Sequence, residues 1–174
     1  MARSRSVILA CVGFALGVML PAAGNAQVHR SADHDFRVVT VANGFEHPWA
    51  IAFLPDGDIL VTERPGRLRV IRDGRLVAAP IEGVPEVFAV GQGGLLDVHP
   101  HPDFPSNRMI YLTYSKPQGG QESTTTLIRG RLENDRLTNV EEVFEAVSQG
   151  RGHYGSRIAF DEDGYLFVSV GERM

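Results

Sequence analysis

Short runs of alternating apolar and polar residues recur along the chain, and no convincing amphipathic helix follows residue 26. Three copies of one pattern are present, at residues 49–71, 94–115 and 155–173. Each copy has a short apolar run, a turn that contains aspartate, and a run rich in β-branched, aromatic and aliphatic residues. This pattern predicts a series of β-hairpins.

The copies correspond to one another position by position. Ile-Ala-Phe at residues 51–53 returns at residues 158–160, and the run at 59–62 matches those at 110–113 and 166–169. Repetition at a fixed spacing indicates a repeat architecture, in which each copy supplies one structural unit.

The turns inside the copies also correspond. Asp56 and Gly57 join the two runs of the first copy, and Asp163 and Gly164 join those of the third. Asp-Gly between two apolar runs favours a tight hairpin, because glycine adopts positive φ without penalty. In the second copy we expect a longer loop, at residues 103–108.

Further strand candidates lie between the copies, at residues 66–71 and 125–132. Each unit then holds about four strands and recurs every roughly 45–60 residues, which is typical of the blades of a β-propeller. A β-sandwich explains the alternation but not the match between the first and third copies. We therefore predict an all-β propeller fold, with residues 36–174 forming roughly its first two to three blades.

Composition and charge exclude some functions. The net charge is −4 and the isoelectric point about 5.8, so the chain has no basic surface for nucleic acid. Its single cysteine, Cys11, lies near the N-terminus, which leaves none for a disulfide or a thiolate metal site in the rest of the chain.

The N-terminus has the layout of a secretory signal peptide. Arg3 and Arg5 precede an apolar run at residues 7–20, and small residues lead to a cleavage site after Ala26. The apolar run is shorter than the roughly 20 residues that span a bilayer. We expect residues 1–26 to be removed from a periplasmic or secreted bacterial protein without a membrane span, and residues 27–35 to form a flexible leader.

Two loops that precede blade strands carry candidate functional residues. His153 lies between glycine and tyrosine before the third copy, and an imidazole there suits a general base. Gln92 occupies the corresponding loop before the second copy, where its amide suits a sugar hydroxyl. Arg157, close to His153, is a candidate for an anionic ligand, with solvated surface charge as the alternative.

Other motifs indicate chemistry less strongly. His99 and His101 resemble a metal pair, but their prolines favour an extended segment in which both rings face solvent or the next blade. Residues 161–164 resemble the start of a calcium loop but lack its distal glutamate, so a hairpin turn is favoured. Ser156 lies in no nucleophile elbow.

Three motifs in this order resemble a known family: HPWAIAFLPDGDILVTERPGRLRVI at residues 47–71, GQGGLLDVHPHPDF at 91–104 followed by RMIYLTYS at 108–115, and HYGSRIAFDEDGYLFVSVGER at 153–173. They are similar to the N-terminal part of the soluble, pyrroloquinoline-quinone-dependent aldose sugar dehydrogenases of the glucose/sorbosone dehydrogenase family. The resemblance runs from about residue 36 to residue 173 and implies a six-bladed β-propeller.

The resemblance also implies functional roles. His153 corresponds to the general base that takes a proton from the anomeric hydroxyl of a sugar while hydride passes to the quinone. Gln92 corresponds to a residue of the substrate and cofactor pocket. Some members have an aspartate before the base, where this chain has Gly152. The resemblance implies pyrroloquinoline quinone and calcium as cofactors, with ligands that mostly fall outside the matching region, and it leaves the metal ligands and the electron acceptor unassigned.

Two alternative functions remain open from the sequence. One is a non-catalytic propeller that binds a protein or a sugar, and the other is a calcium-dependent propeller hydrolase of the lactonase type. We also expect the chain to be a truncated part of a propeller, because roughly 45–60 residues per blade allow it fewer blades than a closed propeller needs. The chain by itself is therefore expected to be inactive.

Overall fold

The computed structural model describes residues 27–173, so the predicted signal peptide lies outside the described residues. The chain divides into two units between Val39 and Thr40. The two units are described separately below.

The first unit contains a small antiparallel hairpin. Its strands are β1 (Val28–His29) and β2 (Phe36–Arg37). The Ser31 hydroxyl closes the turn, because it donates to the carbonyl oxygen of His34 at 2.6 Å and accepts from the His34 amide at 3.1 Å. The predicted leader at residues 27–35 thus contains one strand and its turn.

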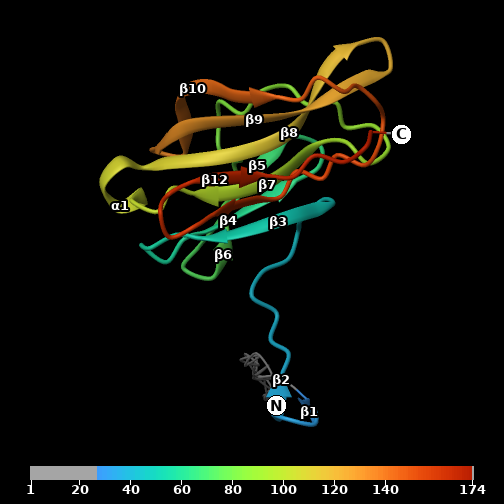
Figure 1. The fold of residues 1–174 in the computed structure, drawn as a ribbon. Helices are drawn as coiled ribbons and strands as arrows, with labels where there is room; N and C mark the ends of the chain where they lie inside the picture. The colour runs from blue at the N-terminus through green and yellow to red at the C-terminus, as the bar shows by residue number, and fades with distance from the viewer. Residues whose placement is uncertain (1–26, 174) are drawn as a thin grey trace, which may run out of the picture. The chain divides into compact units, whose positions relative to one another are not determined.

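The second unit consists of three antiparallel sheets (Figure 1). The strand order is β3-β4-β5-β6 in the first sheet, β10-β9-β8-β7 in the second and β11-β12 in the third. The strands are β3 (Pro48–Phe53), β4 (Ile59–Glu63), β5 (Arg67–Arg72), β6 (Arg75–Leu76), β7 (Leu95–Pro100), β8 (Met109–Gly119), β9 (Glu122–Glu133), β10 (Arg136–Glu145), β11 (Ile158–Phe160) and β12 (Leu166–Val168). Two four-stranded sheets and the start of a third confirm the prediction of an all-β fold built from blades.

Both predicted Asp-Gly turns form as hairpins. Gly57 has a φ of 96° and Gly164 has a φ of 86°, a region that glycine enters without strain. The Asp161 carboxylate accepts from the amides of Asp163 at 3.1 Å and Tyr165 at 2.8 Å. The carboxylate closes the turn between β11 and β12, which confirms the predicted hairpin.

The loop predicted at residues 103–108 contains one helical turn, α1 (Phe104–Asn107). Phe104 is buried in the core, and Arg108 ends the turn with a φ of 56° while its amide donates to the carbonyl oxygen of Phe104 at 2.8 Å. Burial of one aromatic ring therefore gives this segment a compact form that its proline and polar residues did not predict.

Hydroxyl groups at one repeated position link neighbouring sheets. Thr62 accepts a hydrogen bond from the Ala50 amide of its own sheet at 3.0 Å and donates to the Leu96 carbonyl of the second sheet at 2.6 Å. Thr113 repeats this arrangement, accepting from Asp97 at 3.0 Å and donating to Ser156 at 2.7 Å. Thr62 and Thr113, which occupy equivalent positions in the first and second copies, therefore make equivalent contacts to the next blade.

Thr113→Val is expected to destabilise the fold by about 1–3 kcal/mol, because valine keeps the shape but leaves a buried amide and a buried carbonyl without their partner. Thr138→Val is the matched control, since its hydroxyl makes only a 3.4 Å contact with Arg131. Urea unfolding measures both changes. Equal unfolding free energies for the two variants would contradict the proposed link between sheets.

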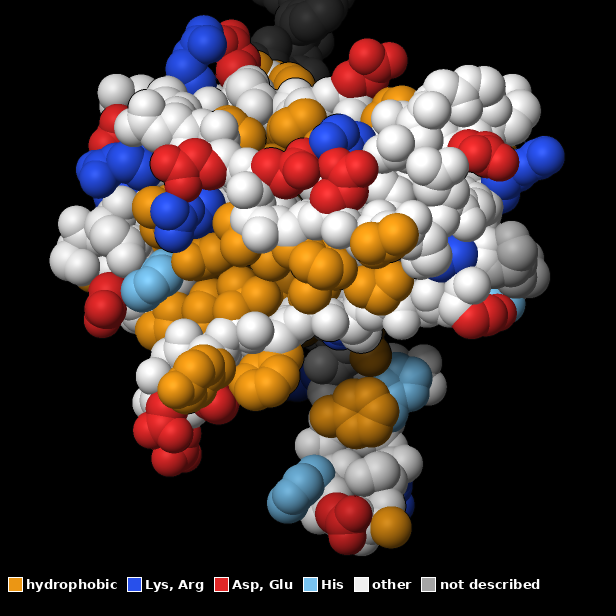
Figure 2. Space-filling model, turned by 45° about the horizontal axis from the view of Figure 1, so that its top comes forward, with side chains coloured by type: hydrophobic (Ala, Val, Ile, Leu, Met, Phe, Trp, Pro, Cys, Tyr) orange, Lys and Arg blue, Asp and Glu red, His pale blue; other side chains and the backbone are white. Residues whose placement is uncertain are grey.

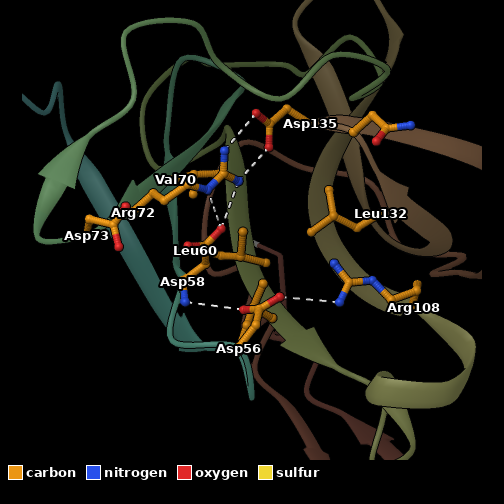
Figure 3. A pocket seen from close by; sticks show the side chains of 11 residues that line it. Asp56, Asp58, Leu60, Val70, Arg72, Asp73, Arg108, Leu132 and Asp135 are labelled. Atoms are coloured by element: carbon orange, nitrogen blue, oxygen red, sulfur yellow. Dashed lines mark hydrogen bonds and ion pairs between the residues drawn. The ribbon is translucent and has the colours of Figure 1, made fainter.

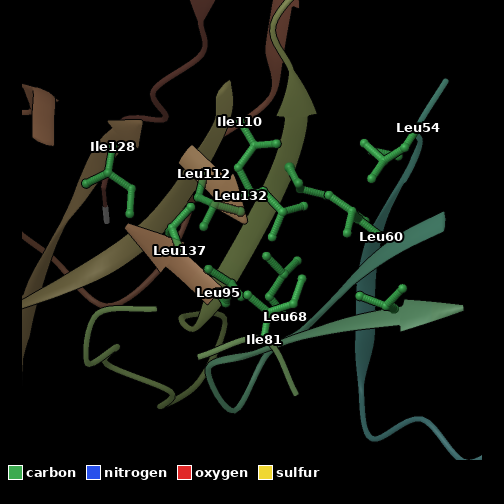
Figure 4. Packing of buried hydrophobic residues seen from close by; sticks show 14 of the residues in the cluster. Leu54, Leu60, Leu68, Ile81, Leu95, Ile110, Leu112, Ile128, Leu132 and Leu137 are labelled. Atoms are coloured by element: carbon green, nitrogen blue, oxygen red, sulfur yellow. The ribbon is translucent and has the colours of Figure 1, made fainter. Parts of the chain in front are cut away.

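The main core lies between the first and second sheets (Figure 4). It is formed by aliphatic side chains that point from the two facing sheets, among them Leu60, Leu68, Leu95, Ile110 and Leu112, each fully buried. A smaller cluster of Tyr111, Leu127 and Ile158 joins the second sheet to the third. The second sheet is thus packed on both faces, as expected for a blade between two neighbours.

The outer sheets expose apolar side chains on their free faces. Ile51 and Phe53 of β3 are 55% and 70% exposed, while their neighbours Ala50 and Ala52 are buried in the core. Phe167 of the third sheet is 58% exposed. Figure 2 shows one face of the molecule on which apolar side chains gather in a broad band edged by acidic and basic ones.

Candidate active site

His153 lies in the segment between β10 and β11, with a φ of 46° that is uncommon for a residue other than glycine. The neighbouring Tyr154 anchors this segment, because its hydroxyl contacts the Ser123 hydroxyl at 2.6 Å and its carbonyl accepts from Thr125 at 2.9 Å. The His153 side chain itself remains 40% exposed. The imidazole is therefore held by a fixed backbone but is open to a ligand.

Gln92 and His153, which occupy corresponding loops of two copies, lie in contact. The Gln92 Oε1 atom accepts a hydrogen bond from the His153 backbone amide at 2.9 Å. This bond stabilises the left-handed backbone of His153 and leaves the two amide hydrogens of Gln92 unused. Gln92 is therefore a positioning residue for His153, and it lines the same pocket.

Arg64 holds the Gln92 loop from the first sheet. Its guanidinium donates to the carbonyl oxygen of Gly93 at 3.1 Å and also to that of Gly91. The two carbonyls flank Gln92 in the chain, so a single side chain fixes the loop on both sides of the amide. Sequence analysis did not identify Arg64 as a functional residue.

Glu172 is a second residue that sequence analysis missed. Its carboxylate contacts the Nδ1 atom of His153, and the contact forms because the chain passes close beneath His153 at Gly171, where any side chain would collide with the His153 carbonyl. The hydrogen bond with His153 holds the pKa of Glu172 below its ordinary value of 4.5. A carboxylate on Nδ1 favours the tautomer in which Nε2 is the basic nitrogen.

Arg173 supports the same loop from below. Its side chain is buried and donates to the carbonyl oxygens of Gly152 at 2.8 Å and Ser123 at 2.9 Å, and its guanidinium lies 3.9 Å from the centroid of the Tyr154 ring. A buried cation that binds backbone carbonyls on both sides makes this part of the loop rigid.

His153, Tyr154, Gln92 and Arg64 line a pocket of about 360 Å³, and Glu172 and Arg173 are not among its lining residues. His153, Gln92 and Arg64 provide its polar groups, and Trp49 and Leu96 provide apolar walls. A few polar groups in a partly apolar hollow are typical of sites for small ligands. The arrangement can accept a proton at His153 and donate hydrogen bonds from the other two side chains.

Arg157 is not among the residues that line this pocket. It forms an ion pair with the buried Asp97 at 2.8 Å, and its guanidinium lies 5.4 Å from the centroid of the Trp49 ring. Its side chain therefore supports a wall of the pocket, and its predicted contact with substrate or cofactor remains a prediction. Ser156 is fully buried, with its hydroxyl bonded to the Tyr154 carbonyl at 3.3 Å, in a position unsuited to a nucleophile.

The histidine pair of the second copy packs against aromatic rings. The ring centroid of His99 lies 5.3 Å from that of Phe160, and the His101 ring lies 5.9 Å from Phe160 and 6.2 Å from Tyr111. Phe160 belongs to the third sheet, which confirms that these imidazoles face the next blade. Within residues 27–173, no three histidine, cysteine or acidic side chains converge as a metal site.

A larger hollow of about 690 Å³ lies at the turn ends of the first and second sheets (Figure 3). Arg72 pairs there with Asp58 and Asp135, each at 2.8 Å, and Arg108 pairs with Asp56 at 3.3 Å. The hydrogen bonds that Arg72 donates to Asp135 and Asp58 raise the pKa of Arg72. These ion pairs join the turns of two sheets, and neither His153 nor Gln92 lines the hollow, so it is not the candidate active site.

The contact between Glu172 and His153 predicts a measurable titration. Because the pKa of Glu172 is lowered, the contact stabilises the folded protein at pH values above the ordinary glutamate pKa. This stabilisation is lost as the pH falls through the lowered pKa. In ¹³C NMR, the pKa of the Glu172 carboxyl is expected to lie below 4.5 in the parent and to rise toward the ordinary value in His153→Ala. His34→Ala is the control that should keep the low value. An ordinary value in the parent would exclude the contact.

Comparison with known proteins places the chain in a family. The family model described as glucose/sorbosone dehydrogenase matches residues 45–174, and the chain belongs to this family. The aldose sugar dehydrogenase YliI of Escherichia coli K12 is 43% identical over 141 residues, which cover 78% of this chain and 38% of that protein.

Solved structures agree with this assignment. A glucose dehydrogenase crystal structure matches with a TM-score of 0.74 and 44% identity, over 78% of this chain and 41% of its own. The pyrroloquinoline-quinone-bound form of an aldose sugar dehydrogenase from Streptomyces coelicolor matches with a TM-score of 0.69 and 30% identity, again over 78% and 41%.

The chain thus spans 38% to 41% of the length of these relatives. Its fold is part of a β-propeller, as predicted. Among the helices of residues 27–173, none is long and apolar enough to cross a membrane.

Proposed function

We propose that the protein oxidises an aldose at the anomeric carbon with pyrroloquinoline quinone as cofactor, and that His153 is the general base. The observation that carries the proposal is the imidazole of His153, with its Nδ1 atom against Glu172 and its backbone amide held by Gln92, in a ligand-sized pocket. Family membership and a quinone-bound relative support the reaction class.

The residues of the pocket have distinct roles in this reaction. Glu172 keeps the His153 ring oriented, so that Nε2 accepts the proton of the anomeric hydroxyl as the C1–H bond breaks and the C1–O double bond of the lactone forms. The quinone, when bound, accepts the hydride. Gln92 and Arg64 offer hydrogen bonds to the oxygens of the substrate or cofactor.

The pocket fits part of the cofactor. Pyrroloquinoline quinone carries three carboxyl groups, and Arg64 is the one cationic side chain among the described residues that line the pocket. Arg64 already binds two carbonyls, so further cations are needed to hold the cofactor. Calcium has no cluster of ligands within residues 27–173. We therefore propose that the 174-residue chain alone has no dehydrogenase activity. The signal-peptide layout of residues 1–26 supports the separate proposal that the active protein works in the periplasm.

The test is reconstitution of the complete gene product with pyrroloquinoline quinone, with and without calcium, followed by aldose-dependent reduction of a dye. Dye reduction that requires both the quinone and the sugar is the expected result. Sugar binding without dye reduction would instead support the binding-module alternative. Hydrolysis of a lactone that requires calcium would support the hydrolase alternative.

A further inference from the structure

Trp49 is the extra residue of a β-bulge in β3, an edge strand of the first sheet. Pro48 pairs with Glu63 and Ala50 pairs with Thr62, so two steps along β3 match one step along β4. A bulge turns a side chain away from its regular direction, and bulges are frequent next to active sites. The bulge here allows Trp49 to line the pocket.

The Trp49 ring is held in place on one side. The Arg157 guanidinium lies 5.4 Å from the ring centroid and is itself fixed by the buried carboxylate of Asp97. Trp49 is nevertheless 36% exposed, and it lines the same pocket as His153 and Gln92. A fixed, partly open aromatic ring beside a base provides a surface for the apolar face of a ligand.

We propose that Trp49 is a stacking platform for the pyranose ring of the aldose, an inference that rests on the proposed function. A pyranose presents C–H groups on its face, which pack on an aromatic ring, and hydroxyls at its rim, which need hydrogen-bond partners. Gln92 supplies such partners, because its bond to His153 uses only the amide oxygen. Trp49 thus favours cyclic sugars and positions the bound pyranose ring relative to the imidazole of His153.

Fluorescence of the protein without cofactor is the first test. Trp49 is the only tryptophan in the 174 residues, so the difference between the parent and Trp49→Phe isolates its emission. D-Glucose is expected to change this emission with saturation. Acyclic D-glucitol, which has no pyranose face, is expected to leave it unchanged.

Kinetics of the complete, cofactor-loaded protein are the second test. Trp49→Ala is expected to raise KM for D-glucose about tenfold with a much smaller change in kcat, while Trp49→Phe keeps KM within about threefold. Phe53→Ala is the matched control, because Phe53 is an aromatic residue of the same strand and does not line the pocket. Its KM is expected to match that of the parent.

The outcomes separate this proposal from the proposed function. Saturable fluorescence without turnover would support the platform and reject the dehydrogenase. Turnover with unchanged KM in Trp49→Ala and no fluorescence response to D-glucose would reject the platform alone. Emission that responds to pyrroloquinoline quinone but not to D-glucose would overturn the assignment, because the ring would then contact the cofactor and not the sugar.

Discussion

Replacing His153 by alanine in the complete, cofactor-loaded protein is expected to lower turnover by about 10²–10⁴-fold, the usual contribution of a positioned general base. The loss is expected in kcat, because the proton at the anomeric hydroxyl is transferred only in the transition state. Affinity for the quinone is expected to change much less. Stopped-flow reduction of the bound cofactor by an aldose measures the chemical step directly.

Two variants control this experiment. His153→Gln keeps a polar side chain of similar length and should be as slow as the alanine variant if the imidazole acts as a base. His34→Ala removes an exposed histidine of the first unit and should keep the parental rate. Near-parental turnover in His153→Ala would show that another group takes the proton, and Glu172, in contact with the same position, would then be the next residue to replace.

The sequence predicted those features that depend on local chemistry. Asp-Gly turns and alternating strands are encoded within a few residues, so the hairpins of the first and third copies form as predicted. The contact between Gln92 and His153 was not predicted, but it could have been, because both residues occupy the loop before the first strand of a blade. Because the structural unit repeats, corresponding loops of neighbouring units lie side by side, although they are far apart in the sequence.

Contacts that depend on the register of hairpins and on neighbouring sheets were not predicted. Glu172 meets His153 because β11 and β12 pair antiparallel, which brings the residues before the first strand beside those after the second. The repeat pattern contained this signal, since both residues flank the open end of one predicted hairpin. Arg64 gave no such signal, because its partners Gly91 and Gly93 belong to the next blade.

The burial of Asp97 is another feature that the sequence did not predict. Nothing in its local sequence distinguishes it from a surface aspartate, yet its side chain is 5% exposed. Its carboxylate accepts from the amides of Val98 at 3.0 Å and Ile158 at 2.8 Å, and from the Arg157 guanidinium at 2.8 Å. The Ile158 amide belongs to the third sheet and Arg157 directly precedes it, so one side chain attaches that sheet to the second.

Asp97→Ala is expected to lower the free energy of unfolding by about 2–4 kcal/mol. The cost stays below the highest values known for breaking a buried salt bridge, because the Arg157 side chain is 67% exposed and is hydrated by water when Asp97 is removed. The amides of Val98 and Ile158 lose an acceptor and account for most of the cost. Urea unfolding measures the free energy, and hydrogen exchange at the Ile158 amide is expected to become faster.

Asp103→Ala is the matched control, because that carboxylate makes no capping hydrogen bond to α1. Its unfolding free energy is expected to stay within about 0.5 kcal/mol of the parent. A double-mutant cycle with Arg157→Ala then separates the ion pair from the two amide bonds. If Asp97→Ala matched the control and Ile158 kept its protection, the third sheet would be held by the Tyr111, Leu127 and Ile158 cluster alone.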